Sequence, residues 1–256
     1  MVDDIKFSNE GLKVISSIDG INKGMLMDIS IRKLEKDKEI ELHEEFKEIA
    51  VLLIEGKIKI NWENESKIIE RKNVFEENPY CLHVCKDKAI KITALRSSEL
   101  LIQATDNEKK FTSKLYTPED VITEVSSVDI WDSTAARQIK TIFDYSNAPY
   151  SNMVMGEIIS YPGRWSSYVP HHHPQPEVYY YKFDKPQGFG ACFIGDNAYK
   201  VIDGSCAAIP GGLVHPQSTA PGYRMYYCWM IRHLEGNPWN ATRTYEEAHE
   251  WLLKEK

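Results

Sequence analysis

Short runs of β-branched and aromatic residues recur along the whole chain, and Gly, Pro, Asn or Asp usually separates them. Examples are IAVLLIEGKIKINW, IKITAL, LLIQAT, EVYYYKF and MYYCWMI. Long segments with the 3.6-residue apolar period of a helix are missing until the end of the sequence. Many short strands separated by turn residues are typical of a β-sandwich or a small barrel. We therefore expect an all-β fold.

The strand pattern occurs twice, with a break around residues 115–138 that is rich in Ser and Thr. A chain of 256 residues is long enough for two domains. We expect two similar β units, spanning residues 1–115 and 116–256. The closing sequence TYEEAHEWLLKEK predicts a short C-terminal helix, with Thr244 as its N-cap and Glu247 three residues later as a capping box.

Charge and composition exclude several classes of partner. The chain has 38 acidic and 31 basic residues, a formal net charge of -7, and no dense basic run, so we expect no nucleic-acid partner and no membrane partner. It has no apolar run long enough to span a bilayer, and its start, MVDDIKFSNE, does not resemble a secretory signal. We therefore expect a cytoplasmic protein whose five cysteines are reduced thiols.

Histidine is concentrated in one stretch, PHHHPQPEVYYY, at residues 170–181. Residues two apart on a strand share a face, so His171 and His173 should project together, with His172 on the other face. Glu177 lies an even number of positions further along and begins the next strand. Imidazole and carboxylate ligands suit Zn, Mn, Fe or Ni, and these donor types do not select among the four metals.

A fourth metal ligand is expected from GSCAAIPGGLVHP, a strand closed by a Pro-Gly turn that returns His215 toward the core. Gly212 suits such a turn because the backbone there often takes a positive φ. We therefore predict one divalent metal ion held by His171, His173, Glu177 and His215. Zinc is the first candidate, and Mn, Fe and Ni stay open.

Several other side chains are candidates for substrate contact. Tyr179 and Tyr181 should share the interior face with Glu177, because they follow it at even spacing. Tyr223 offers another aromatic surface, and Arg137 could pair with a substrate carboxylate through two hydrogen bonds. Ordinary core packing of the tyrosines, and a surface ion pair for the arginine, are the alternatives.

The first half of the chain contains residues that match only part of this ligand pattern. His43 and Glu48 lie in ELHEEFKEIAVLLIEG, but no second histidine stands beside the first. His83, in NPYCLH, does not fit the Pro-x-Gly-x-x-His spacing of the second half. We therefore expect the N-terminal barrel to lack a metal.

Two patterns in the second half resemble the paired metal-binding motifs of the cupin superfamily: His-x-His-x-x-x-Glu at residues 171–177 and Gly-x5-Pro-x-Gly-x-x-His at residues 204–215. Longer stretches resemble the 5-deoxy-glucuronate isomerase family of inositol catabolism. They are GRWSSYVPHHHPQPEVYYYKFDKPQGFG, APGYRMYYCWM, AHEWL, VFEENPYCLHV and IKITALRSSELLIQAT. This resemblance implies two cupin-type, jelly-roll β-barrels in one chain and an aldose-ketose isomerase.

Three functions are compatible with these residues. The first is a metal-dependent isomerase acting on a small sugar acid, in which a divalent metal stabilises the charge of an enediolate. The second is a cupin dioxygenase that uses iron in the same ligand set. The third is a sugar-binding protein without catalysis. The sequence identifies neither the catalytic base nor the oligomeric state, and a homo-oligomer stays open.

Overall fold

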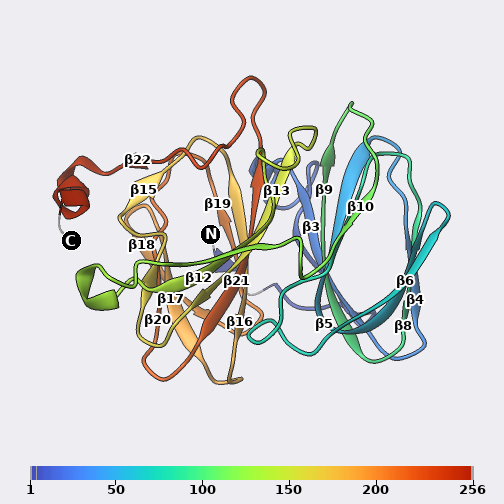
Figure 1. The fold of residues 1–256 in the computed structure, drawn as a ribbon, viewed down its shortest axis with the longest axis horizontal. Helices are drawn as coiled ribbons and strands as arrows, with labels where there is room; N and C mark the ends of the chain where they lie inside the picture. The colour runs from blue at the N-terminus through green and yellow to red at the C-terminus, as the bar shows by residue number, and fades with distance from the viewer. Residues whose placement is uncertain (1, 4, 255–256) are drawn as a thin grey trace. The chain divides into compact units, whose positions relative to one another are not determined.

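The structure, a computed structural model, describes residues 2–3 and 5–254 and divides into two compact units (Figure 1). The N-terminal unit comprises residues 5–121 and 147–153. The C-terminal unit comprises residues 122–146 and 154–254, together with residues 2–3. In the described residues, no helix has both the length and the apolar character needed to cross a membrane. The expected all-β fold is confirmed.

The N-terminal unit is built from antiparallel strands in which β5 is central. Its main sheet has the order β10-β7-β5-β9-β3-β2, and the far half of β5 pairs with β6 and β8, while β8 also pairs with β4. The elements are β2 (Leu12–Ser16), η1 (Lys23–Met25), β3 (Asp28–Leu34), β4 (Glu39–Leu42), β5 (Lys47–Trp62), β6 (Glu65–Arg71), β7 (Cys81–Val84), β8 (Ile90–Ala94), β9 (Ser98–Asp106) and β10 (Lys114–Tyr116).

The core of this unit follows from alternation along β5. Ile49, Val51 and Leu53 are buried in one apolar cluster, to which Ile58 and Ile60 also belong. Side chains two apart share a face of a strand, so this row of branched residues fills the inside of the barrel. Burial of such rows is the main contribution to the stability of a β-sandwich.

The C-terminal unit has a seven-stranded sheet in the order β1-β19-β16-β21-β13-β12-β11, a four-stranded sheet in the order β14-β20-β17-β18, and the short pair β15-β22. Its elements are β1 (Val2–Asp3), β11 (Ile122–Ser126), η2 (Trp131–Ser133), β12 (Arg137–Phe143), β13 (Met153–Ser160), β14 (Trp165–Ser166), β15 (His171–His172), β16 (Glu177–Phe183), β17 (Phe189–Ile194), β18 (Asn197–Ile202), β19 (Cys206–Ile209), β20 (Gln217–Thr219), β21 (Met225–Arg232), β22 (Thr244–Tyr245) and η3 (Glu247–Lys254).

The interior of the C-terminal unit is aromatic. Tyr179, Tyr181 and Phe183 of β16 belong to one buried cluster, together with Tyr227 and Trp229 of the neighbouring β21. This arrangement confirms the inward face that alternation predicts for β16. Glu177 begins the same strand, so its side chain enters the barrel at the end where this aromatic column stops.

The C-terminal helix is present, but its predicted start is wrong. Thr244 lies in β22, whose pairing with β15 holds its backbone extended, so it does not cap a helix. The helix η3 is a 3-10 helix that begins at Glu247. None of its residues is fully buried, and Trp251 is 54% exposed. The five cysteines are buried and free, as expected.

Candidate metal centre

Short strands and prolines determine where the first three candidate ligands lie. β15 holds His171 and β16 begins at Glu177. Proline has no N–H for a strand ladder, and Pro174 and Pro176 fill the gap between the two strands. His173 therefore lies in a loop and not on the continuous strand that the alternation argument assumes.

The fourth candidate ligand, His215, follows the turn after β19. Gly212 in this turn has φ +82°, as expected, and its N–H donates to the carbonyl of His173 over 2.7 Å. A Cβ atom at Gly211 would lie 1.9 Å from the carbonyl oxygen of Pro174. The two glycines therefore let the turn approach the loop that carries His173 closely enough to bond to it.

Each candidate histidine is oriented by a backbone carbonyl two residues away. A carbonyl only accepts hydrogen bonds, so the ring Nδ1 carries the proton and Nε2 of the neutral ring keeps its lone pair. This is the arrangement that metal-binding histidines commonly show. The Nδ1 contacts are His171 with Val169 (2.7 Å), His173 with Gln175 (3.0 Å) and His215 with Leu213 (2.8 Å).

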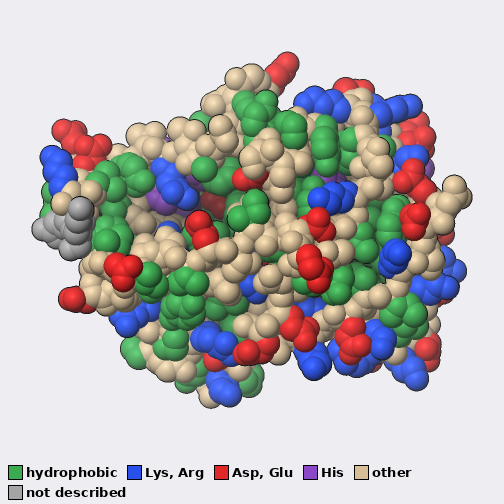
Figure 2. All heavy atoms as spheres, in the orientation of Figure 1, with side chains coloured by type: hydrophobic (Ala, Val, Ile, Leu, Met, Phe, Trp, Pro, Cys, Tyr) green, Lys and Arg blue, Asp and Glu red, His purple; other side chains and the backbone are tan. Residues whose placement is uncertain are grey.

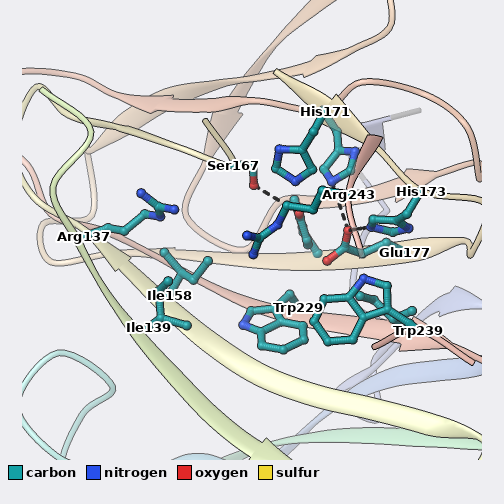
Figure 3. Close-up of a pocket in the computed structure, with 13 residues that line it drawn as sticks. Arg137, Ile139, Ile158, Ser167, His171, His173, Glu177, Trp229, Trp239 and Arg243 are labelled. Atoms are coloured by element: carbon teal, nitrogen blue, oxygen red, sulfur yellow. Dashed lines mark hydrogen bonds and ion pairs between the residues drawn. The ribbon is translucent and has the colours of Figure 1, made fainter. Parts of the chain in front are cut away.

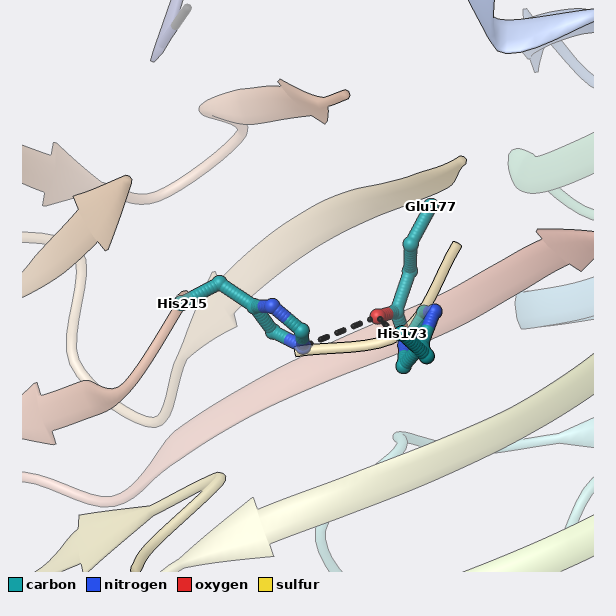
Figure 4. A group of neighbouring side chains, drawn as sticks. All are labelled: His173, Glu177 and His215. Atoms are coloured by element: carbon teal, nitrogen blue, oxygen red, sulfur yellow. Dashed lines mark ion pairs between the residues drawn. The ribbon is translucent and has the colours of Figure 1, made fainter. Parts of the chain in front are cut away.

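Three of the four candidate ligands converge (Figure 4). The carboxylate Oε2 of Glu177 lies 3.3 Å from Nε2 of His173 and 3.2 Å from Nε2 of His215, and all three side chains are buried. Burial raises the pKa of Glu177, but hydrogen bonds with the two histidines outweigh it and lower that pKa to about 2. Burial lowers the pKa of His215, and its bond to Glu177 raises it above the usual value.

These three residues fit a divalent metal ion. Without a metal, a proton on Nε2 lets each ring donate to the Glu177 carboxylate. If both rings are neutral and keep their proton on Nδ1, the two Nε2 lone pairs and the carboxylate face one another as acceptors, and a cation would satisfy all three. Bonds of about 2.0–2.2 Å to zinc at tetrahedral or octahedral angles separate ligand atoms by roughly 3.0–3.4 Å. The ligand atoms of His173, Glu177 and His215 lie within 4.8 Å of one another, so they form a potential metal site.

His171 lies beside this group but outside the set within 4.8 Å. Its ring centroid is 5.5 Å from that of His215, and the side chain is buried. Burial lowers the pKa of His171 to about 3, so the ring is neutral near pH 7. Its role as a metal ligand stays a prediction.

The potential metal site opens into a cavity of about 70 Å³ in the C-terminal unit (Figure 3). Apolar side chains form one wall, and Arg137 lies on the side away from His173. The Arg243 side chain extends from beside His171 toward Arg137. Figure 2 shows a hollow on this face of the molecule, with histidine and basic side chains at its edge. The lining residues besides the candidate ligands are Arg137, Ile139, Ile158, Ser167, Tyr179, Trp229, Ile231, Trp239 and Arg243.

Two of the four predicted substrate contacts line this cavity. Arg137 reaches it from β12, and the Tyr179 hydroxyl lies 3.5 Å from Ser167 Oγ at its edge. Tyr181 lies deeper in the barrel, where its hydroxyl donates to Gln217 Oε1 over 2.8 Å, and Tyr223 lies outside the cavity lining. Substrate contact by these last two stays a prediction that the geometry does not support.

Sequence reasoning missed Arg243, Trp229 and Trp239. Trp229 could have been found from alternation, because Tyr227, Trp229 and Ile231 are two apart on β21 and share its inward face. Arg243 and Trp239 lie in the segment between β21 and β22. Their approach to the cavity depends on the pairing of β22 with β15, which no local pattern indicates.

Comparisons with known proteins agree with these observations. The model of the KduI/IolB family matches residues 3–252. The 5-deoxy-glucuronate isomerase of Bacillus subtilis subsp. natto is 27% identical over 227 aligned positions, and the match covers 81% of this chain and 80% of that protein. The enzyme of the same name from Bacillus licheniformis is 23% identical and covers 96% of this chain and 95% of its own length.

Solved structures show the same fold. An IolB-like protein from Salmonella typhimurium superposes with a TM-score of 0.87 at 22% identity, covering 98% of both chains. Oxalate decarboxylase from Lactobacillus farciminis has a TM-score of 0.67 at 12% identity, covering 99% of this chain and 89% of its own. The fold is therefore that of the cupins, in two barrels, and the names of the relatives indicate an isomerase. Because the family model matches nearly the whole length, the chain belongs to the KduI/IolB family.

Proposed function

We propose that this protein is a metal-dependent aldose-ketose isomerase acting on a uronate-type sugar acid, converting 5-deoxy-glucuronate to 2-deoxy-5-keto-gluconate in inositol catabolism. The observation that carries the proposal is the cavity itself. At one end it holds the buried group His173, Glu177 and His215, and on another side it holds a buried guanidinium, that of Arg137. The name shared by the curated relatives supports the same substrate.

The reaction moves a proton between two adjacent carbons while the carbonyl and hydroxyl oxygens exchange roles. His173, Glu177 and His215 would hold the metal, with His171 as the proposed fourth ligand. Zinc is the first candidate for the ion. A bound divalent ion would supply Lewis-acid polarisation of substrate oxygens.

In this proposal, Tyr179 donates a hydrogen bond to a substrate oxygen. It follows Glu177 by two residues on β16, so both side chains enter the cavity from the same strand face. Burial raises the pKa of Tyr179 well above its usual value, so the phenol keeps its proton near neutral pH. Tyr179 is therefore a proton donor in this site and not a resting-state base.

The apolar wall of the cavity limits access of water to the reacting carbons. Trp229 and Trp239 lie with their ring centroids 5.6 Å apart and are 6% and 8% exposed. Exclusion of water strengthens electrostatic interactions in the site and would protect an enediolate from unwanted protonation.

Metal analysis of the purified protein, with an isomerisation assay followed by NMR on 5-deoxy-glucuronate, tests the proposal. We expect about one metal ion per chain in the wild type, and loss of both metal and turnover in His173→Ala and His215→Ala. His172→Ala is the matched control, because His172 is adjacent and lies outside the ligand group. It should keep the metal and the activity.

A wild-type protein that holds metal but does not convert 5-deoxy-glucuronate would contradict the proposed substrate. Turnover that survives complete removal of the metal would contradict metal dependence. The metal content is measured separately from the assay, so the two results are not confused.

A further inference from the structure

The cavity beside the potential metal site has an unusual balance of charge for this acidic chain. Among the described residues that line it, two are cationic, Arg137 and Arg243, and one is acidic, Glu177. The whole chain carries a formal net charge of -7. Any attraction of an anionic ligand must therefore arise locally, from these two guanidinium groups and a bound metal.

Arg137 is a buried cation with an unused donor. It is 6% exposed, and its Nη1 donates to the carbonyl of Ala135 over 2.9 Å and to Ser127 Oγ over 3.2 Å. Its Nε is buried without a hydrogen-bond partner in the described part of the chain. Burial lowers the pKa of Arg137, although guanidinium stays charged in proteins. A buried charge of this kind is costly unless an anion pairs with it.

Arg243 reaches the cavity because β22 pairs with β15. Tyr245 lies opposite His171 in this pairing, and the two rings are 6.0 Å apart. In an extended chain Arg243 projects to the same side as Tyr245, toward the cavity it lines. Arg243 is exposed, and it forms no hydrogen bond or ion pair with another described residue.

The two guanidinium groups are directed toward one another across the cavity (Figure 3). Two like charges facing each other repel, and the presence of Arg243 contributes to the lowered pKa of Arg137 after the larger effect of burial. An anion between them would remove the repulsion and satisfy the free Nε of Arg137. Planar guanidinium groups match the two oxygens of a carboxylate especially well.

We propose that Arg137 and Arg243 together form a carboxylate-binding subsite, and that Arg243 determines the preference for an acidic sugar over a neutral one. The inference rests on the proposed function, because a sugar acid held here by its carboxylate would reach the metal with its other end. It adds a specificity residue that lies far from the ligand motifs in sequence and is supplied by the segment before β22.

Arg243→Gln is the informative variant, because the exposed side chain can be replaced without opening the core, whereas Arg137 is buried. Calorimetric titration of the metal-loaded protein with D-glucuronate and with D-glucose measures affinity without turnover. We expect Arg243→Gln to weaken glucuronate binding roughly 10- to 100-fold, the loss typical of one charge-assisted hydrogen bond, with glucose binding unchanged. The KM for the acidic substrate should rise by a similar factor, more than kcat falls.

Two further variants calibrate the result. Arg243→Lys keeps the charge but loses the planar guanidinium group. Its affinity for glucuronate should therefore lie between those of the wild type and Arg243→Gln. Arg96→Gln is the matched control, because Arg96 is an exposed arginine of the N-terminal unit paired with Glu70 at 2.9 Å. It should bind glucuronate as the wild type does.

Glucuronate affinity in Arg243→Gln within about twofold of the wild type would overturn the subsite, and so would a wild type that binds glucuronate no better than glucose. If glucuronate binds in an Arg243-dependent way but 5-deoxy-glucuronate is not isomerised, the subsite stands and the proposed reaction fails. If the wild type isomerises its substrate and Arg243→Gln keeps the wild-type KM and affinity, the reaction stands and the subsite fails.

Discussion

Each unit of the molecule buries a glutamate against a histidine, but the two carboxylates have different partners. In the N-terminal unit, Glu48 accepts from His83 over 2.8 Å, from Ser151 Oγ over 3.0 Å and from the backbone N–H of Asn152 over 2.6 Å. In the C-terminal unit, the recorded partners of Glu177 are histidine nitrogens. A carboxylate saturated by protein donors has little left to offer a metal. Glu177 would instead share a metal with the two Nε2 atoms when both rings are neutral and protonated on Nδ1.

The side chains around the two glutamate–histidine pairs also differ. His83 is enclosed by aromatic rings, with Phe111 at a centroid distance of 4.8 Å and Tyr150 at 6.1 Å. His43, which also matches part of the metal-binding motif, is exposed and pairs with Asp87. The same residue types therefore form a buried, hydrogen-bonded pair in one unit and a potential metal site in the other. The difference lies in the donors and rings that surround each carboxylate.

The largest effect should come from removing the metal. A ligand that binds only the native state stabilises it by about 4 kcal/mol at a concentration 1,000 times its Kd. We expect a chelator to lower the stability of metal-loaded wild type by that order, and to leave Glu177→Gln unchanged because this variant no longer binds metal. Thermal unfolding with and without chelator measures the shift. An equal shift in both proteins would place the metal elsewhere.

The next effect separates the two carboxylates. Glu48→Gln should lower the free energy of unfolding by about 3 kcal/mol, because the buried donors around Glu48 lose a charged acceptor. Its metal content and its response to chelator should match the wild type. Urea unfolding and metal analysis check this pair of outcomes. Loss of metal in Glu48→Gln would break the distinction between the two units.

The smallest effects concern the turn of the C-terminal unit that precedes His215. Gly212→Ala meets open space and should cost only about 1 kcal/mol for its positive φ. Gly211→Ala should cost roughly 2–3 kcal/mol, since its Cβ would collide with the Pro174 carbonyl, and it should also weaken metal binding. Urea unfolding and metal titration of the two variants should show the larger loss of stability and of metal affinity in Gly211→Ala. Equal costs would show that close approach of the turn does not matter.

Local spacing was enough to identify part of the site. The alternation of β16, the cluster at residues 171–177 and the Pro-Gly turn before His215 are all short-range patterns, and the structure brings His173, Glu177 and His215 together. The all-β fold was also readable from strand lengths and turn residues. These features depend on neighbours in sequence, which is the information a single chain displays.

Contacts set by strand pairing could not be read in this way. His83 does not fit the motif spacing, yet it faces Glu48 because β7 pairs with β5 and puts His83 opposite Ala50, diagonal to Glu48. Arg243 depends on a pairing of two-residue strands. The same pairing turns Thr244, predicted to cap a helix, into strand. The positions of His83, Arg243 and Thr244 therefore depend on strand pairing between segments that are distant in sequence.

The pairing of β1 with β19 has a consequence for dissecting the protein. Val2 lies opposite Ala207, so the sheet that carries Glu177 includes a strand from upstream of the whole N-terminal unit. The unit that carries the potential metal site is therefore not contiguous in sequence. A fragment cut between the two units would expose the backbone edge of β19, the strand that leads into the turn before His215, and bare edges of this kind invite pairing with other chains.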